Sequence, residues 1–77
     1  MDRDEILEIM EESDQERIEY TDKDGVTRTG YVDVFESRYD NDGEASLCFA
    51  GDEGEMLIVY ESDIAEIKIL TDESSPE

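Results

Sequence analysis

Among the side chains that could take part in chemistry, carboxylates are by far the most abundant in this sequence. It carries 25 Asp and Glu residues against six Lys and Arg, and it contains no histidine and no tryptophan. Histidine-based triads, histidine metal ligands and histidine acid–base catalysis are therefore excluded. A catalytic pair of carboxylates needs one member desolvated so that its pKa rises, and so short a chain has few places to bury one. We therefore expect a protein that is not an enzyme and that uses no cofactor.

One acidic segment has the residue types of a calcium-binding loop. It comprises Asp40, Asn41, Asp42 and Glu44. These oxygens could hold a divalent cation weakly, but the EF-hand spacing fails. Alignment on Gly43 places an arginine at the first ligand position, and alignment on Gly25 places a tyrosine there. The favoured interpretation is a turn whose Asx side chains bond their own backbone, so we expect no metal site.

The single cysteine bears on compartment and reactivity. Cys48 lies between Leu47 and Phe49, with no nearby base to lower its pKa. We interpret it as a small buried or half-buried filler, with a reactive thiol as the alternative. One cysteine and an acidic start at residues 1–5, unlike a secretory signal, predict a cytoplasmic protein. The longest apolar run, residues 56–60, is far too short to cross a bilayer, so we expect no membrane partner.

The net charge of −19 is the most unusual property of the sequence, and the acidic residues are spread along the whole chain. Binding to nucleic acid or to an anionic membrane depends on Lys and Arg that neutralise negative charge. The acidity therefore opposes both kinds of binding. It is either a solvated surface, as in many bacterial cytosolic proteins, or a functional surface that meets a basic partner or imitates nucleic acid.

The spacing of apolar residues predicts one domain over residues 1–70 and a disordered acidic tail over residues 71–77. A short helix is expected at about residues 4–12, with Asp4 as its cap. From residue 16 the apolar period changes to two, which indicates strands joined by short turns. The expected strands cover residues 16–21, 26–35, 45–50, 56–60 and 65–70, with a short turn or 3₁₀ helix at residues 62–64.

The second expected strand contains Gly30, which we interpret as a sharp bend where a small barrel turns its corner. Strict alternation along this strand would place Val32 and Val34 on one face and Tyr31 and Phe35 on the other. The fold class is therefore mainly β: a short helix, then a five-stranded antiparallel, strongly bent small barrel. Closure of the barrel would remove the exposed strand edges.

This order of elements, with its bent second strand, resembles the Sm-like small barrel, which is related in shape to Src-homology-type barrels. The first Sm motif has a glycine, an aliphatic residue two places on, an aromatic at five and an acid at six. Gly30, Val32, Phe35 and Glu36 stand in those places. The aliphatic half of the second motif is matched by Ile64 and Ile67.

The resemblance implies RNA binding in the family, but the positions that would contact RNA differ here. Tyr39 and Asp40 occupy the contact positions, with the expected asparagine one place late, and Tyr60 and Glu61 stand where the family has an Arg-Gly pair. Together with the net charge, these departures argue against Sm-type RNA binding.

The leading hypothesis is a non-enzymatic interaction module that binds another protein or associates with itself. Aromatic side chains around the end of the second strand, together with the apolar fourth strand, form the predicted interaction surface. The candidates are Tyr31, Phe35, Tyr39, Met56, Ile58 and Tyr60. A neighbouring chain could extend the fourth strand by β-addition. The alternatives are an acidic mimic of nucleic acid that inhibits a basic protein, and Sm-type RNA binding.

Overall fold

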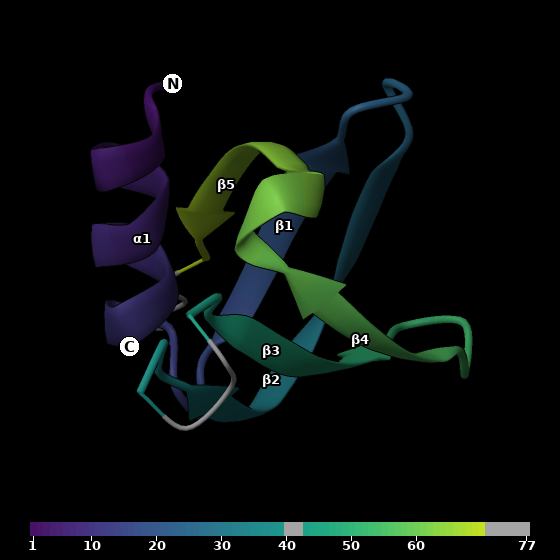
Figure 1. Cartoon of the computed structure of the whole chain (residues 1–77). Helices are drawn as coiled ribbons and strands as arrows, with labels where there is room; N and C mark the ends of the chain where they lie inside the picture. The colour runs from purple at the N-terminus through teal and green to yellow at the C-terminus, as the bar shows by residue number, and fades with distance from the viewer. Residues whose placement is uncertain (40–42, 71–77) are drawn as a thin grey trace, which may run out of the picture.

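The computed structural model describes residues 1–39 and 43–70, and it shows a mainly β fold behind one N-terminal helix (Figure 1). The predicted fold class and the 3₁₀ turn are confirmed. The turn or cation loop expected at Asp40–Asp42 and the tail expected at residues 71–77 lie outside the described residues. The elements are α1 (Arg3–Glu12), β1 (Arg17–Asp22), β2 (Thr27–Glu36), β3 (Ser46–Gly51), β4 (Met56–Tyr60), η1 (Glu61–Asp63) and β5 (Ile64–Ile69).

Helix α1 begins at Arg3, one residue earlier than expected, because Asp2 rather than Asp4 is its N-cap. The Asp2 Oδ1 atom accepts from the Glu5 backbone N–H at 2.9 Å, and Glu5 Oε1 accepts from the Asp2 N–H at 3.2 Å. This reciprocal pair satisfies two backbone donors at once, which a cap at Asp4 could not do with the residues that follow it. The buried side of the helix carries Ile6 and Met10 into the core.

The five strands form one antiparallel sheet in the order β4-β3-β2-β1-β5. The predicted closure into a barrel is wrong, since the outer strands β4 and β5 do not pair with each other. The two edges differ in their surroundings: α1 packs against β5, whereas the contacts of β4 within the described residues are concentrated on β3 (Figure 1). Among the described residues, no strand pairs with the outer edge of β4.

The core lies between the sheet and α1, which contributes Ile6 and Met10 to it. Its buried members are Ile6, Met10, Ile18, Tyr20, Val32, Ala45, Leu47, Phe49, Val59, Ile64 and Ile67. The rings of Tyr20 and Phe49 meet edge to face with centroids 5.1 Å apart, an arrangement that the ring quadrupoles favour. Leu47 and Phe49 lie on the same face of β3, and both are completely buried. No helix in the described residues is long and apolar enough to cross a membrane.

Strand β2 contains an irregularity that reverses the faces predicted for its second half. The register against β3 shifts between Val32 and Val34, where one extra residue is accommodated. Val34 is consequently 39% exposed, although alternation placed it beside buried Val32, and Phe35 packs against the core instead of facing outward. The alternation rule is wrong here because a single bulged residue moves every later side chain to the opposite face.

Gly30 serves a packing function that the sequence interpretation did not include. A Cβ atom at this position would collide with the Ala50 carbonyl oxygen, and it would lie 2.7 Å from the Gly51 Cα and 2.8 Å from the Phe49 ring. The absence of a side chain therefore lets β2 and β3 approach closely over the Phe49 ring. The bend itself stays a prediction, whereas the register shift is found two residues further along β2.

Candidate interaction surface

The outward side of β2, β3 and β4 carries a continuous apolar surface. Residues directly opposite each other on neighbouring strands share a face, and the register aligns Tyr31 with Ala50 and Met56 in one row. A second row runs from Val34 through Cys48 to Ile58. With Tyr60 at the end of β4, we call this set the outer apolar face: Tyr31, Val34, Cys48, Ala50, Met56, Ile58 and Tyr60.

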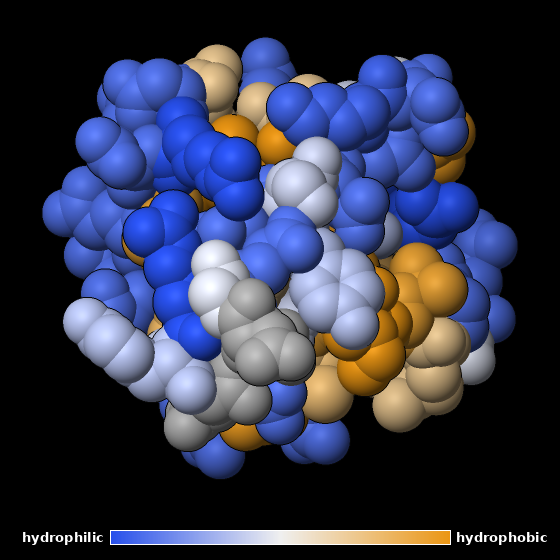
Figure 2. Space-filling model, viewed as in Figure 1, coloured by the Kyte–Doolittle hydropathy of each residue, from blue (hydrophilic) through white to orange (hydrophobic). Residues whose placement is uncertain are grey.

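The side chains of the outer apolar face are strongly exposed on the edge strand. Met56 is 71% exposed and Ile58 is 54% exposed, whereas Val59, the neighbour of Ile58 along the chain, is 3% exposed. Figure 2 shows hydrophobic side chains gathered at the lower right, over β3 and β4, on a face that is otherwise largely hydrophilic. A contiguous exposed apolar surface of this kind is typical of a contact site for another molecule.

The backbone of β4 also presents hydrogen-bonding groups that have no partner among residues 1–39 and 43–70. Gly51 N–H donates to the Glu55 carbonyl at 2.8 Å and Glu61 N–H donates to the Ala45 carbonyl at 2.9 Å. In an antiparallel ladder the polar groups of alternate residues point to opposite sides. Leu57 and Val59 therefore bond to β3, and the N–H and C=O groups of Met56 and Ile58 point to the free edge. The next outward donor, the Tyr60 N–H, is already taken by Asp63 Oδ2 at 3.2 Å.

A cavity of about 260 Å³ lies between β4 and the β1–β2 hairpin. Its walls are Tyr20, Asp22, Lys23, Asp24, Arg28, Leu57, Ile58, Val59 and Asp63. Burial is the main cause that raises the pKa of the Tyr20 hydroxyl, and Arg28 partly offsets it. The backbone N–H of Val26 is the main cause that lowers the pKa of Asp22, with Arg28 Nη1 also donating to that carboxylate at 3.1 Å. Asp22 and Arg28 thus neutralise each other at the cavity wall.

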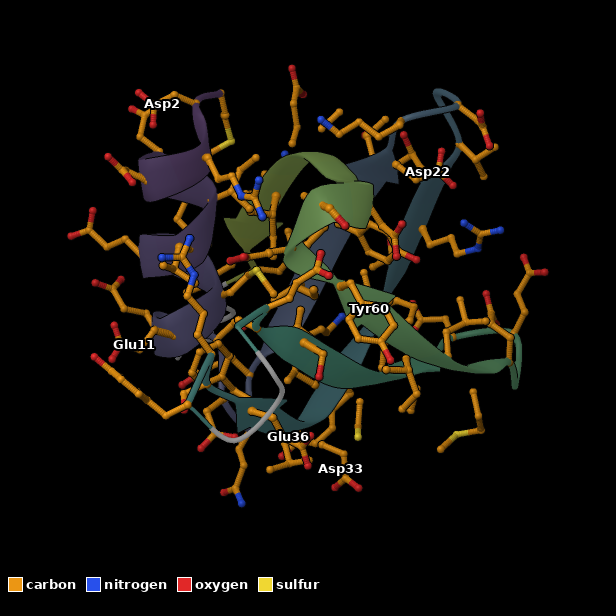
Figure 3. All side chains as sticks on the ribbon, viewed as in Figure 1. Asp2, Glu11, Asp22, Asp33, Glu36 and Tyr60 are labelled. Carbon is orange, nitrogen blue, oxygen red and sulfur yellow. The ribbon has the colours of Figure 1, made fainter. Side chains whose placement is uncertain are left out.

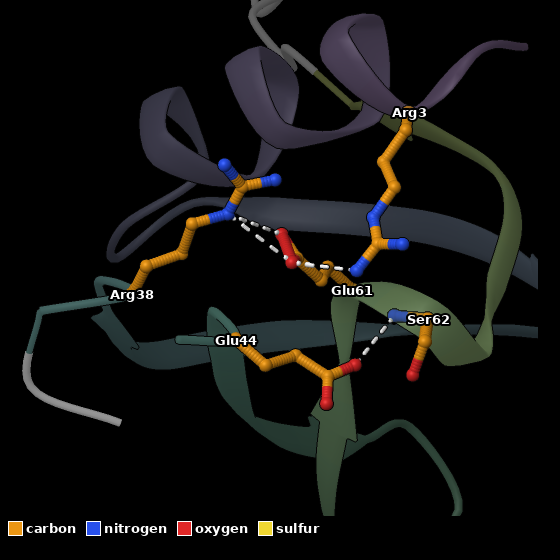
Figure 4. A network of polar contacts seen from close by, with 5 residues as sticks. All are labelled: Arg3, Arg38, Glu44, Glu61 and Ser62. Atoms are coloured by element: carbon orange, nitrogen blue, oxygen red, sulfur yellow. Dashed lines mark hydrogen bonds and ion pairs between the residues drawn. The ribbon is translucent and has the colours of Figure 1, made fainter. Parts of the chain in front are cut away.

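A buried carboxylate fixes the segment that follows β4. Glu61 is fully buried, and its carboxylate accepts from Arg3 of α1 at 3.0 Å and from Arg38 beyond β2 at 3.2 Å (Figure 4). Beside it, Glu44 accepts from the Ser62 N–H at 3.0 Å, and hydrogen bonds from Ser62 lower the Glu44 pKa. These contacts tie η1 to α1 and to the segment between β2 and β3, and so they hold the C-terminal end of β4 in place.

The basic side chains of the protein are largely engaged internally. All six lie in the described residues, and five of them form ion pairs with carboxylates. The shortest pair joins Arg17 to Asp52, with two hydrogen bonds of 2.7 and 2.6 Å. The sixth cation, Lys23, is at the cavity wall. Few cations are therefore left to neutralise the phosphates of a nucleic acid.

The structure brings together four of the six predicted surface residues. Tyr31, Met56, Ile58 and Tyr60 belong to the outer apolar face. The other two, Phe35 and Tyr39, line a separate hollow of about 320 Å³ beside Leu7 and Glu11 of α1, and Tyr39 is 99% exposed there.

Three members of the outer apolar face were not among the predicted residues. Cys48 and Ala50 could have been found, because alternation along β3 places them opposite buried Leu47 and Phe49. Val34 could not have been predicted from alternation, since its outward orientation depends on the bulge in β2. Cys48 is half-buried among apolar neighbours, which agrees with the filler interpretation of this residue. Within the described residues, no group of three or more potential ligands could hold a metal ion.

Fold and surface together define a class: a small, open, five-stranded antiparallel sheet with an N-terminal helix and an apolar edge strand. Comparison with protein-family models, with curated proteins and with solved structures finds no match for this chain.

Proposed function

We propose that this protein is a non-enzymatic interaction module that binds a protein partner by adding the partner's strand to the free edge of β4. The observation that carries the proposal is the coincidence of two features on the same residues. Met56 and Ile58 direct their backbone groups to the free edge and expose their apolar side chains. Strand addition uses both features, since backbone hydrogen bonds supply affinity and alternate side chains supply specificity.

A partner other than a second copy fits the charge of the molecule. Two chains of net charge −19 repel each other at close approach. Asp33 and Glu36 are exposed on β2 near Val34, at the β2 border of the outer apolar face, and Figure 3 shows both at the bottom of the molecule, below Tyr60. A second copy would bring the same carboxylates toward this border, whereas a partner with basic residues would gain attraction there.

The other interpretations have less support. The carboxylates labelled in Figure 3, namely Asp2, Glu11, Asp22, Asp33 and Glu36, lie around the periphery of the molecule and do not converge as a phosphate-like array would. The proposal includes a cytoplasmic location, which the single free cysteine supports. It also includes a relationship to the Sm-like barrels, which the order of one helix and five antiparallel strands supports.

Ile58→Pro tests the proposal. Proline removes the edge-facing N–H of residue 58 but leaves the bonds between β3 and β4, because residue 58 does not donate to β3. We expect this variant to bind a nine-residue peptide of alternating valine and serine about tenfold more weakly than the wild type, since a hydrogen bond and a side-chain contact are lost together.

Ile58→Val is the matched control, because it retains the N–H group and a branched apolar side chain. Binding of both variants is measured by titration calorimetry, and circular dichroism confirms that each is folded. Equal affinities for the proline and valine variants would contradict strand addition at β4.

A further inference from the structure

The partner's strand can be described further, because the inner side of β4 differs chemically from its outer side. Residues of an added strand that lie opposite Ile58 would share the outer apolar face, and those opposite Leu57 and Val59 would point inward. Their inward direction leads to the cavity between β4 and the β1–β2 hairpin, whose walls include Leu57 and Val59 together with Ile58 between them. The side chains at these alternate positions of the partner would therefore point toward the cavity.

The size of the cavity suits a long side chain. Its volume of about 260 Å³ is several times the ~30 Å³ that one water molecule occupies in the liquid. Its apolar walls, which are Leu57, Ile58 and Val59, would contact the methylene stem of such a side chain, while the polar head reaches the hairpin.

The charges at the cavity favour a cation. Asp22, Asp24 and Asp63 face Lys23 and Arg28, which leaves one negative charge in excess. Asp22 is already paired with Arg28, and Asp63 accepts from the Tyr60 backbone. Asp24 therefore remains as the wall carboxylate whose oxygens have no hydrogen-bond partner among the described residues, and the net charge of −19 draws cations toward it.

We infer that the strand bound by β4 alternates apolar and basic residues: its apolar side chains cover Met56 and Ile58, and a Lys or Arg side chain enters the cavity toward Asp24. This inference rests on the proposed function, and it adds the chemistry of the partner. Asp24 would attract this basic side chain, and Lys23 would repel it.

Three nine-residue peptides with blocked ends test the inference on the full-length protein. All have valine at alternate positions, and the positions between carry lysine, serine or glutamate. We expect affinity to fall in the order lysine, serine, glutamate. Asp24→Asn should weaken binding of the lysine peptide about threefold, as a single exposed ion pair would, and Lys23→Gln should strengthen it by a similar factor.

Glu12→Gln is the matched control, because it makes the same change in net charge on an exposed position of α1. Equal weakening by Asp24→Asn and Glu12→Gln would show that only the overall charge acts, and it would overturn the inference. Serine and lysine peptides that bind equally would overturn it as well, while leaving strand addition intact. If Ile58→Pro affects no peptide, the proposed function itself fails. A stable dimer in light scattering, dissociated by Ile58→Pro, would make a second copy the occupant and would also overturn the inference.

Discussion

Gly30→Ala is expected to lower the free energy of unfolding by about 3 kcal/mol, the upper part of the range for overpacked core positions. The new methyl group would collide with the Ala50 carbonyl oxygen and lie 2.7 Å from the Gly51 Cα. Both are backbone atoms of β3, so relief of the collision requires the two strands to separate. Separation would also disturb Phe49, which is completely buried at the centre of the core. Urea denaturation followed by circular dichroism measures the change.

Gly51→Ala is the matched control, because the same methyl group is added to the neighbouring strand. There it would meet the carboxylate of Glu55, a flexible side chain that can move into solvent. The control should therefore lose much less stability. Similar losses for both variants would contradict this explanation, because only the methyl group at residue 30 meets backbone atoms of the neighbouring strand.

Glu61→Ala is expected to destabilise the protein by about 2 kcal/mol. Removal of one partner from a buried ion pair costs about 3–5 kcal/mol when the other charge stays buried. The Arg3 and Arg38 side chains are 59% and 43% exposed, so water can solvate them after the change, and the cost is smaller. The loss should concentrate where α1 meets η1, because Glu61 joins them.

Hydrogen exchange of the α1 amides, with urea denaturation, measures this effect. Glu44→Ala is the control in the same region, since its carboxylate is hydrogen-bonded to Ser62 but, unlike that of Glu61, is not fully buried. A wild-type-like stability for Glu61→Ala, or an equal loss for Glu44→Ala, would contradict a structural function of the buried carboxylate.

Local patterns in the sequence predict much of this fold because they depend on neighbouring residues only. The bounds of β4 agree at Met56 and Tyr60, and Leu47 and Phe49 face inward as alternation requires. Closure of the sheet was not predictable in the same way, because pairing of β4 with β5 depends on how α1 and η1 pack between distant segments. The cap at Asp2 was missed although Glu5 completes a recognisable capping box.

The candidate interaction surface has features that sequence patterns could not predict. The apolar run at residues 56–60 identified the edge strand, but it gave no information on which backbone groups are free. Phe35 was assigned to the surface because alternation cannot detect a bulge before it. Asp24 and Val59 line the same cavity, and such an arrangement of residues distant in the chain has no local signal.

Hydrogen exchange of single amides in β4 tests strand addition most directly. In the free protein the Met56 and Ile58 amides should exchange fast and those of Leu57 and Val59 slowly, because only the latter two donate to β3. Addition of the valine–lysine peptide should slow Met56 and Ile58 and leave Leu57 and Val59 unchanged. Bound peptide with Met56 and Ile58 still exchanging at their free rates would show that the partner does not extend this sheet.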